Sequence, residues 1–210
     1  MPIFHDVEQK SPQWYALRLG IPTASSFDQL VTPTGRPSKS ASPYARFLAA
    51  ELFVGRPLDM WSGNSWTDRG REMESQAVQL YEFTRDVEVR KCGFVTRADG
   101  LAGCSPDGLL GDDGMIEVKC LSVSNHIAAI MHHRATGHCP ADYVPQTQGQ
   151  IMLCERAWCD LLFYHPELPS LVIRQTALPE IAAVLATQLA AVIAERDAVL
   201  EILRSIGRAG

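Results

Sequence analysis

Two β-prone segments meet at the tight turn Gly111-Asp112-Asp113-Gly114, and this pattern limits the fold more than any other feature of the chain. Leu101–Leu110 comes before the turn and Met115–Leu121 comes after it. Short β-prone runs on either side of a glycine-containing turn are typical of a β-hairpin. We therefore predict a hairpin over residues 101–121.

The second half of this hairpin carries charged residues in a regular pattern. Successive side chains of a strand point to opposite faces, so Glu117 and Lys119 should share one face while Val118 points into the core. The hairpin returns that face to a point beside Asp107, in the sequence Ser105-Pro106-Asp107-Gly108. We expect two carboxylates and one ammonium group to converge there.

A long segment with helical periodicity lies upstream of the hairpin. Ser65–Phe83 is predicted to be a helix that Ser65 caps, with Asp68 three residues later. Its apolar face is formed by residues at helical spacing, namely Trp66, Met73, Ala77, Leu80 and Tyr81. Glu74 lies at the border of that face, where a carboxylate can point into a cleft.

The remaining segments complete an α/β pattern. We predict helices at residues 12–19, 43–53, 145–154 and from Pro179 onward, and strands near residues 87–95, 161–164 and 171–175. Helices that flank a central mixed sheet define an α/β fold class. We expect a single domain over residues 1–210, with the helix from about 179 at its C-terminal end.

The three charged groups of the hairpin suit metal-dependent hydrolysis of a phosphodiester. Magnesium prefers oxygen ligands, so Asp107 and Glu117 would hold it, Glu74 could add a third carboxylate, and the carbonyl of Val118 could also reach the ion. Such a metal polarises the scissile phosphate and lowers the pKa of a bound water. Lys119 would orient the attacking water or stabilise charge that builds on the phosphate.

Composition sets broad limits on the class of protein. The 210 residues carry a net charge of −5, which argues against a simple basic coat for nucleic acid but not against a nuclease with a carboxylate-rich site. The first residues do not resemble a signal peptide, and no apolar stretch is long enough to cross a bilayer, so we expect a cytoplasmic protein. Six cysteines occur without a Cys-x-x-Cys pair, which favours reduced thiols over a zinc or iron–sulfur site.

Three other interpretations of these residues stay open. The hairpin could simply carry solvated charges, since a Glu-x-Lys triplet is common. The chain could be a non-catalytic nucleic-acid-binding module. Glu117→Ala would leave binding by such a module unchanged, whereas it would abolish the activity of a nuclease. A zinc site could form from His126, His132, His133 and His138 with Cys139, although the adjacent His132-His133 pair lacks the i, i+4 spacing of a helical metal pair.

Several sequence blocks also occur in the order found in a known family. They are WYALRLG from Trp14, TASS from Thr23, GREME from Gly70, CSPDG from Cys104, IEVKC from Ile116 and QTQ from Gln146. From about Trp14 to Tyr164 the chain resembles the PD-(D/E)xK nuclease superfamily. More narrowly, it is similar to the phage lambda exonuclease and YqaJ-type viral recombinase family. The resemblance implies a restriction-endonuclease-like core.

The resemblance implies roles for the residues at the centre of the chain. Asp107, Glu117 and Lys119 match the catalytic trio of the superfamily. Glu74 matches a helix glutamate that joins the metal site. Gln148 matches a glutamine on the helix after the catalytic strands, where it would hydrogen-bond near the water or the scissile phosphate.

A second set of positions is implied to bind DNA. Arg18, Ser25 and Ser105 match positions that bind a terminal 5′-phosphate. Their chemistry agrees, because a guanidinium grips a phosphate with two parallel hydrogen bonds and serine hydroxyls donate to phosphate oxygens. Trp14 could stack on a base, although core packing is the commoner use of a tryptophan. A pocket for the terminal phosphate would fix which bond reaches the metal.

The resemblance further implies a 5′-to-3′ exonuclease that acts on linear double-stranded DNA, releases mononucleotides and leaves a 3′ overhang. It implies Mg²⁺, with Mn²⁺ as an alternative and two ions per site. It also implies a ring of three subunits, a single-strand annealing partner, and phage or prophage recombination in a bacterial cell. Cas4-like, RecB-like and restriction-type nucleases share the trio. The missing cysteine cluster counts against a Cas4-like protein, and Arg18 with Ser25 favours recognition of ends.

Overall fold

The predicted hairpin forms half of a four-stranded sheet in the computed structural model, which describes residues 1–58 and 65–208. β4 (Gly108–Leu110) and β5 (Gly114–Cys120) are antiparallel, as a hairpin requires. β6 (Trp158–His165) runs parallel to β5, and β7 (Leu168–Thr176) runs antiparallel to β6. The strand order is β4-β5-β6-β7, so the sheet is mixed and the predicted α/β class is confirmed.

A second sheet of three strands shows where the sequence-based boundaries are wrong. Its order is β1 (Ile3–His5), β2 (Phe94–Thr96) and β3 (Gly103–Cys104). The predicted strand over residues 101–110 is therefore split between the two sheets. Pro106 lies at the break, and a proline cannot donate a hydrogen bond to a sheet ladder. The break leaves Asp107 between β3 and β4, where its N–H donates to the carbonyl of Ile116 at 3.1 Å.

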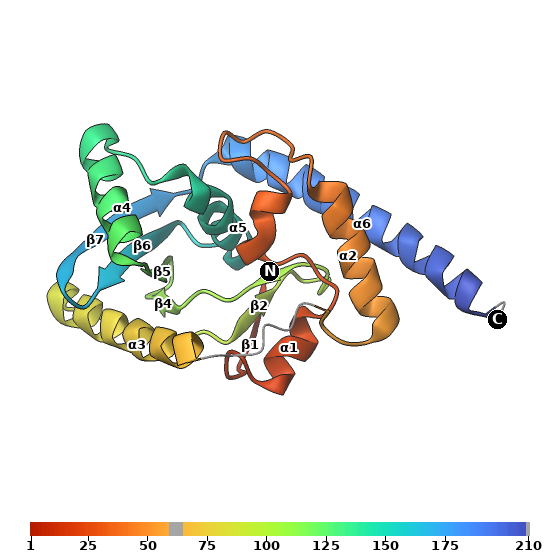
Figure 1. The fold of residues 1–210 in the computed structure, drawn as a ribbon, viewed down its shortest axis with the longest axis horizontal. Coiled ribbons are helices and arrows are strands. Elements are labelled where there is room, and N and C mark those ends of the chain that lie inside the picture. Colours follow the sequence, from red (N-terminus) through yellow and green to blue (C-terminus); the bar gives the residue numbers. More distant parts are fainter. Residues whose placement is uncertain (59–64, 209–210) are drawn as a thin grey trace.

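Helices cover both faces of the four-stranded sheet (Figure 1). α3 (Ser65–Arg85) packs Ala77 and Tyr81 against Val118 and Leu162 on one face. α4 (Val123–Thr136), which we did not predict, and α5 (Val144–Cys154) contact β6 on the other side. For residues 65–71 the structure describes the backbone alone, so the Ser65 cap and the contacts of Trp66 and Asp68 named above for α3 lie outside what it describes.

α5 approaches the N-terminal part of the chain through a glycine. The 3₁₀ helix η1 (Ala24–Gln29) packs on α5, and a Cβ atom at Gly149 would lie 2.2 Å from the ring of Phe27. A residue larger than glycine would therefore push the two elements apart. This close approach fixes η1, and with it Ser25, relative to the polar residues of α5.

The described residues form three further α-helices, one near the start of the chain and two that pack together. α1 (Pro12–Arg18), α2 (Ala41–Val54) and α6 (Pro179–Arg208) all occur close to their predicted positions. A short 3₁₀ helix, η2 (Ala141–Tyr143), leads into α5. α6 lies along α2, and its C-terminal end extends beyond the rest of the chain (Figure 1). Among the described residues, no helix is both long and apolar enough to span a membrane.

Candidate active site

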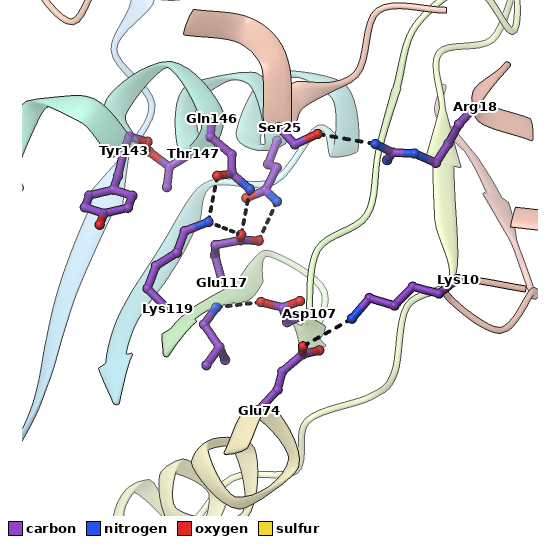
Figure 2. Close-up of polar contacts among 12 residues, drawn as sticks. Lys10, Arg18, Ser25, Glu74, Asp107, Glu117, Lys119, Tyr143, Gln146 and Thr147 are labelled. Atoms are coloured by element: carbon purple, nitrogen blue, oxygen red, sulfur yellow. Dashed lines mark hydrogen bonds and ion pairs between the residues drawn. The ribbon is translucent and has the colours of Figure 1, made fainter. Parts of the chain in front are cut away.

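The hairpin brings Asp107 and the charged pair of β5 together, as the alternation of side chains predicted. The N–H of Val118 donates to Oδ2 of Asp107 at 2.6 Å. Lys119 Nζ lies 2.8 Å from Oε1 of Glu117 on the same strand. Figure 2 shows Asp107 between Glu117 and Glu74, and we call Glu74, Asp107, Glu117 and Lys119 the carboxylate cluster.

Two glutamines of α5 hold Glu117 in place. Gln146 donates through Nε2 to Oε1 of Glu117 at 2.6 Å and accepts from Lys119 Nζ through Oε1 at 2.8 Å. Gln150 donates to the other Glu117 oxygen at 2.7 Å. Both contacts were missed from the sequence, although residues 146 and 150 lie one helical turn apart and must share a face. The buried Glu117 carboxylate is thereby fixed by three side chains.

The prediction that Gln148 would reach the reacting groups is wrong in this structure. Its Nε2 donates to the carbonyl of Thr176 at 2.9 Å, and its Oε1 accepts from the N–H of Leu178 at 2.7 Å. Gln148 is two residues from Gln146 and so points to a different side of the helix. It joins α5 to the link between β7 and α6, and Gln146 takes the place expected of it.

Burial and charge change the acidity of the carboxylate cluster. Burial, and then repulsion from Glu117 and Glu74, raise the pKa of Asp107 well above its usual value. The bond from Val118 and the attraction of Lys119 offset only part of that rise. For Lys119, burial disfavours the ammonium, but attraction to Glu117 and Asp107 outweighs it and raises the pKa. The cluster thus holds more negative charge than its own lysine neutralises.

This donor set fits a hard cation. Burial, and then repulsion from Glu117 and Glu74, raise the pKa of Asp107, and a divalent ion would offset that repulsion. Of the two carboxylate oxygens of Asp107, Oδ2 alone accepts a hydrogen bond from the described residues, so Oδ1 is available to a ligand. Among those residues, no three His, Cys, Asp or Glu side chains come close enough to enclose a metal. An open set is typical of Mg²⁺, which keeps several waters and uses one or two carboxylates.

A second polar group lies across from the carboxylate cluster. Arg18 donates through Nη2 to the hydroxyls of Thr23 at 3.3 Å and Ser25 at 3.4 Å, and its guanidinium lies 4.1 Å from the ring centre of Trp14. The indole N–H of Trp14 donates to Ser105 Oγ at 2.8 Å. Arg18, Ser25 and Ser105, which the resemblance implied to bind a terminal phosphate, therefore lie together with Trp14, which was suggested to stack on a base.

Arg18 lines a pocket of about 390 Å³ together with Trp14, Thr23 and Tyr44. Burial lowers the pKa of the Arg18 guanidinium, since the charge is removed from water. Among the described residues Arg18 makes no ion pair with a carboxylate. Its direct partners are neutral hydroxyls and the rings of Trp14 and Phe94, whereas the Glu51 carboxylate that lines the same pocket accepts from the N–H groups of Gly20 and Leu58. A desolvated cation of this kind is suited to an anionic ligand. We call this the Arg18 pocket.

The family model for the YqaJ-like viral recombinase domain matches residues 13–157 of the chain. The chain belongs to this family. The matched range contains every residue of the carboxylate cluster, and Trp14, Arg18, Ser25 and Ser105 of the second group. No curated protein sequence matches the chain at a significant level.

Solved structures agree with the membership of the YqaJ-like family. An alkaline exonuclease (LHK-Exo) from Laribacter hongkongensis is 29% identical with a TM-score of 0.81, covering 95% of this chain and 100% of that one. The structure of LHK-Exo in complex with dAMP is 28% identical in sequence, with a TM-score of 0.80 and the same coverage of both chains. A phage-related exonuclease from Haemophilus somnus 129PT, at 16% identity and a TM-score of 0.66 over 87% of this chain and 96% of that one, shares the fold. Family and neighbours together support a nuclease.

The histidines that suggested zinc lie away from both groups of the YqaJ-like domain. His126 is fully buried in α4 and pairs through Nε2 with the carbonyl of Pro169 at 2.9 Å. His133 pairs through Nδ1 with the carbonyl of His138 at 3.1 Å, and His132 is exposed. The six cysteines are free thiols, and burial raises the pKa of Cys92, for example, to about 12. Buried thiols of this kind act as small apolar residues.

Proposed function

We propose that the chain is a Mg²⁺-dependent exonuclease that degrades one strand of linear double-stranded DNA from its 5′-phosphorylated end. It would release mononucleotides in the 5′-to-3′ direction and leave a 3′ overhang. The observation that carries this proposal is that the two groups are neighbours, because Ser105, which accepts from Trp14 beside Arg18, lies two residues before Asp107. The carboxylate cluster suits hydrolysis of a phosphodiester, and the Arg18 pocket suits a terminal phosphate beside it.

The carboxylate cluster would hold the metal through Asp107 and Glu117, with Glu74 and the carbonyl of Val118 as further oxygen donors. Mg²⁺, as one ion or two, supplies the polarisation of the phosphate and the activation of water in such sites, and Mn²⁺ has the same ligand preference.

Lys119 acts in this proposal as a donor rather than as a base. Attraction to Glu117 and Asp107 raises its pKa and keeps it protonated. An ammonium held by Glu117 Oε1 and Gln146 Oε1 can orient the attacking water or stabilise charge on the phosphate. Gln146 is a positioning residue, because it touches both Glu117 and Lys119 and fixes their separation.

The Arg18 pocket would set direction. A terminal phosphate held by Arg18, Ser25 and Ser105 leaves the next phosphodiester bond to reach Asp107, and a strand held by its 5′ end is shortened from that end. Trp14 already stacks on the guanidinium and bonds Ser105, so its role is to orient these two groups rather than to stack on a base.

The family membership motivates three wider proposals. The chain would work as a homotrimeric ring, would cooperate with a single-strand annealing protein, and would serve phage or prophage recombination in the bacterial cytoplasm. The ring, the annealing partner and the role in recombination are proposed by analogy with the family, because a fold by itself does not define partners.

Digestion of linear duplex DNA with and without a 5′-phosphate, in Mg²⁺ or in chelator, tests the central proposal. We expect metal-dependent loss of the phosphorylated strand from its 5′ end, with mononucleotides as product. Covalently closed circular duplex is the matched control and should stay intact. Cleavage of the circle at internal sites would instead establish a restriction-type nuclease, and DNA binding without any cleavage would establish a binding module.

A further inference from the structure

Lys10 lies between the two groups of the site, three residues before the range that the family model matches. Its side chain lines the Arg18 pocket and at the same time its Nζ lies 4.0 Å from Oε2 of Glu74. Figure 2 shows Lys10 reaching from the side of Arg18 toward Glu74, next to Asp107. Lys10 therefore lies where a strand must pass if its end is held by Arg18 and its next phosphate is at Asp107.

The turn that carries Lys10 is built to present it at this place. Gln9 donates through Nε2 to the carbonyls of Cys92 at 2.8 Å and Pro106 at 3.0 Å, which ties the turn to the residue before Asp107. Ser11 follows and caps α1 by accepting from the N–H of Trp14. Lys10 between them has a φ of 68°, a left-handed conformation that glycine adopts freely and lysine does not. The fold keeps a lysine at a position where glycine would be conformationally easier.

The contact between Lys10 and Glu74 is weak enough to be exchanged. The two side chains are 35% and 36% exposed, and an exposed pair at 4.0 Å contributes little to stability. Glu74 is also one of the charges that raise the pKa of Asp107, so it belongs to the set of donors suited to a metal. A cation that engages Glu74 would repel the ammonium of Lys10 toward the cleft.

We propose that Lys10 grips the first internucleotide phosphate of the DNA strand, the one that is cleaved, and leaves Glu74 to do so. This inference rests on the proposed function in taking DNA as the ligand. Lys10 thus binds the scissile phosphate directly, whereas Arg18 holds the terminal phosphate. Lys10 therefore exchanges one anionic partner for another: it pairs with Glu74 in the free protein and with the DNA backbone in the complex.

The test measures DNA affinity and thermal stability of three variants. Lys10→Gly removes the ammonium and suits the left-handed backbone, Lys10→Met removes only the charge, and Lys10→Arg keeps it. Kd is measured for duplexes with a 5′-phosphate or a 5′-hydroxyl, in Ca²⁺ buffer in which the DNA is checked to stay intact. Lys91→Met is the matched control, since Lys91 is exposed and lines neither group.

We expect Lys10→Gly and Lys10→Met each to weaken binding about tenfold, by the same factor for both kinds of end, as loss of one charged hydrogen bond predicts. The slope of log Kd against log salt should flatten by about 0.9, the value for one phosphate contact on duplex DNA. Lys10→Arg should bind within about threefold of wild type, and the Tm of Lys10→Gly should not fall. Affinity lost together with an unchanged or higher Tm is a result that a purely structural role would not give.

Two results would overturn the assignment of Lys10. Wild-type affinity in Lys10→Met would show that the ammonium does not touch DNA. A loss confined to 5′-phosphorylated ends would place Lys10 on the terminal phosphate instead. If the Tm of Lys10→Gly falls, the Lys10→Met result decides. The proposed nuclease function would be refuted by a different result, namely a wild-type protein that binds DNA ends but never cleaves them. In that case the Kd values still decide whether Lys10 contacts DNA.

Discussion

The carboxylate cluster and the Arg18 pocket differ in how fully the protein itself satisfies their polar groups. In the cluster, Glu117 accepts hydrogen bonds of 2.6–2.8 Å from Gln146, Lys119 and Gln150. In the pocket, Arg18 has hydrogen bonds of 3.3 and 3.4 Å to neutral hydroxyls, which is long for a charged donor.

On the proposed function, this difference separates the two tasks of the site. Groups that must act on a reacting phosphate are held rigidly by a second layer of side chains, because small displacements cost rate. Groups that must capture a phosphate keep their hydrogen-bonding capacity for the ligand. A variant in the cluster should therefore lower turnover, and a variant in the pocket should change which end is chosen.

The strongest test of this separation is Lys119→Met. It keeps the aliphatic stem and removes the ammonium between Glu117 and Gln146. We expect kcat to fall by about 10²–10³, the usual cost of losing one group that stabilises transition-state charge. The preference for a 5′-phosphate should remain, because Arg18 is untouched. Steady-state digestion of both kinds of end measures this, with Lys91→Met as control, and loss of the end preference would contradict it.

Arg18→Ala should have the complementary effect. The rate on 5′-phosphorylated ends should fall about ten- to hundredfold, which corresponds to about 1.5–3 kcal/mol for charged hydrogen bonds. Cleavage of 5′-hydroxyl ends should stay near wild type, so the two rates should converge. Arg18→Lys should recover only part of the difference, because an ammonium cannot form two parallel bonds or stack on Trp14 as a guanidinium does. An equal fall on both ends would show that Arg18 acts elsewhere.

Two substitutions on different faces of α5, Gln146→Ala and Gln148→Ala, form a matched pair with smaller expected effects on activity and stability. Gln146→Ala should lower kcat about ten- to hundredfold, as is usual for a residue that orients the reacting groups, with little change in Tm. Gln148→Ala should instead remove the two hydrogen bonds that join α5 to Thr176 and Leu178, at a cost of about 0.5–1.5 kcal/mol each. At this chain length each kcal/mol lowers Tm by about 2–4 °C. A loss of kcat without a loss of Tm in Gln148→Ala would reverse our assignment.

The residues that the sequence predicted are those that follow a short-range rule. Glu117 and Lys119 share a face because strand side chains alternate, and the turn at residues 111–114 then brings them to Asp107. Gln146 and Gln150 obey an equally simple rule, the i, i+4 spacing of a helix, but the family motif drew attention to Gln148 instead. A motif marks a segment, whereas periodicity decides which of its residues face the site.

Other parts of the fold depend on contacts that no local pattern contains. α4 was missed although Val123, Ile127 and Met131 recur at helical spacing; that apolar stripe is exposed, and which face packs inward, at His126 and Ala129, depends on tertiary contacts. Lys10 was missed because its role depends on Glu74, distant in sequence, and on a left-handed backbone conformation. These features follow from tertiary packing and cannot be found in a window of neighbouring residues.

The smallest expected effect concerns what the carboxylate cluster costs the protein when no metal is bound. The pKa of Asp107 is raised in the folded state by burial and by Glu117 and Glu74, so ionisation of Asp107 opposes folding. Its stabilising neutral form is complete below the unfolded pKa, about 3.9, and is lost as the pH rises through the folded value. Asp107→Asn stays neutral throughout and lacks this loss.

We therefore expect Asp107→Asn to raise the Tm of chelator-treated protein at neutral and alkaline pH, by an amount that shrinks toward pH 4. The sign follows from the raised pKa: wild type loses stability with rising pH where the variant does not. The Arg18 pocket should show no such gain, since Arg18 carries the same charge across this range. Thermal unfolding over a pH series measures both, and a Tm of Asp107→Asn that stays at or below wild type at alkaline pH would mean that burial and repulsion do not raise the pKa of Asp107 in the folded protein.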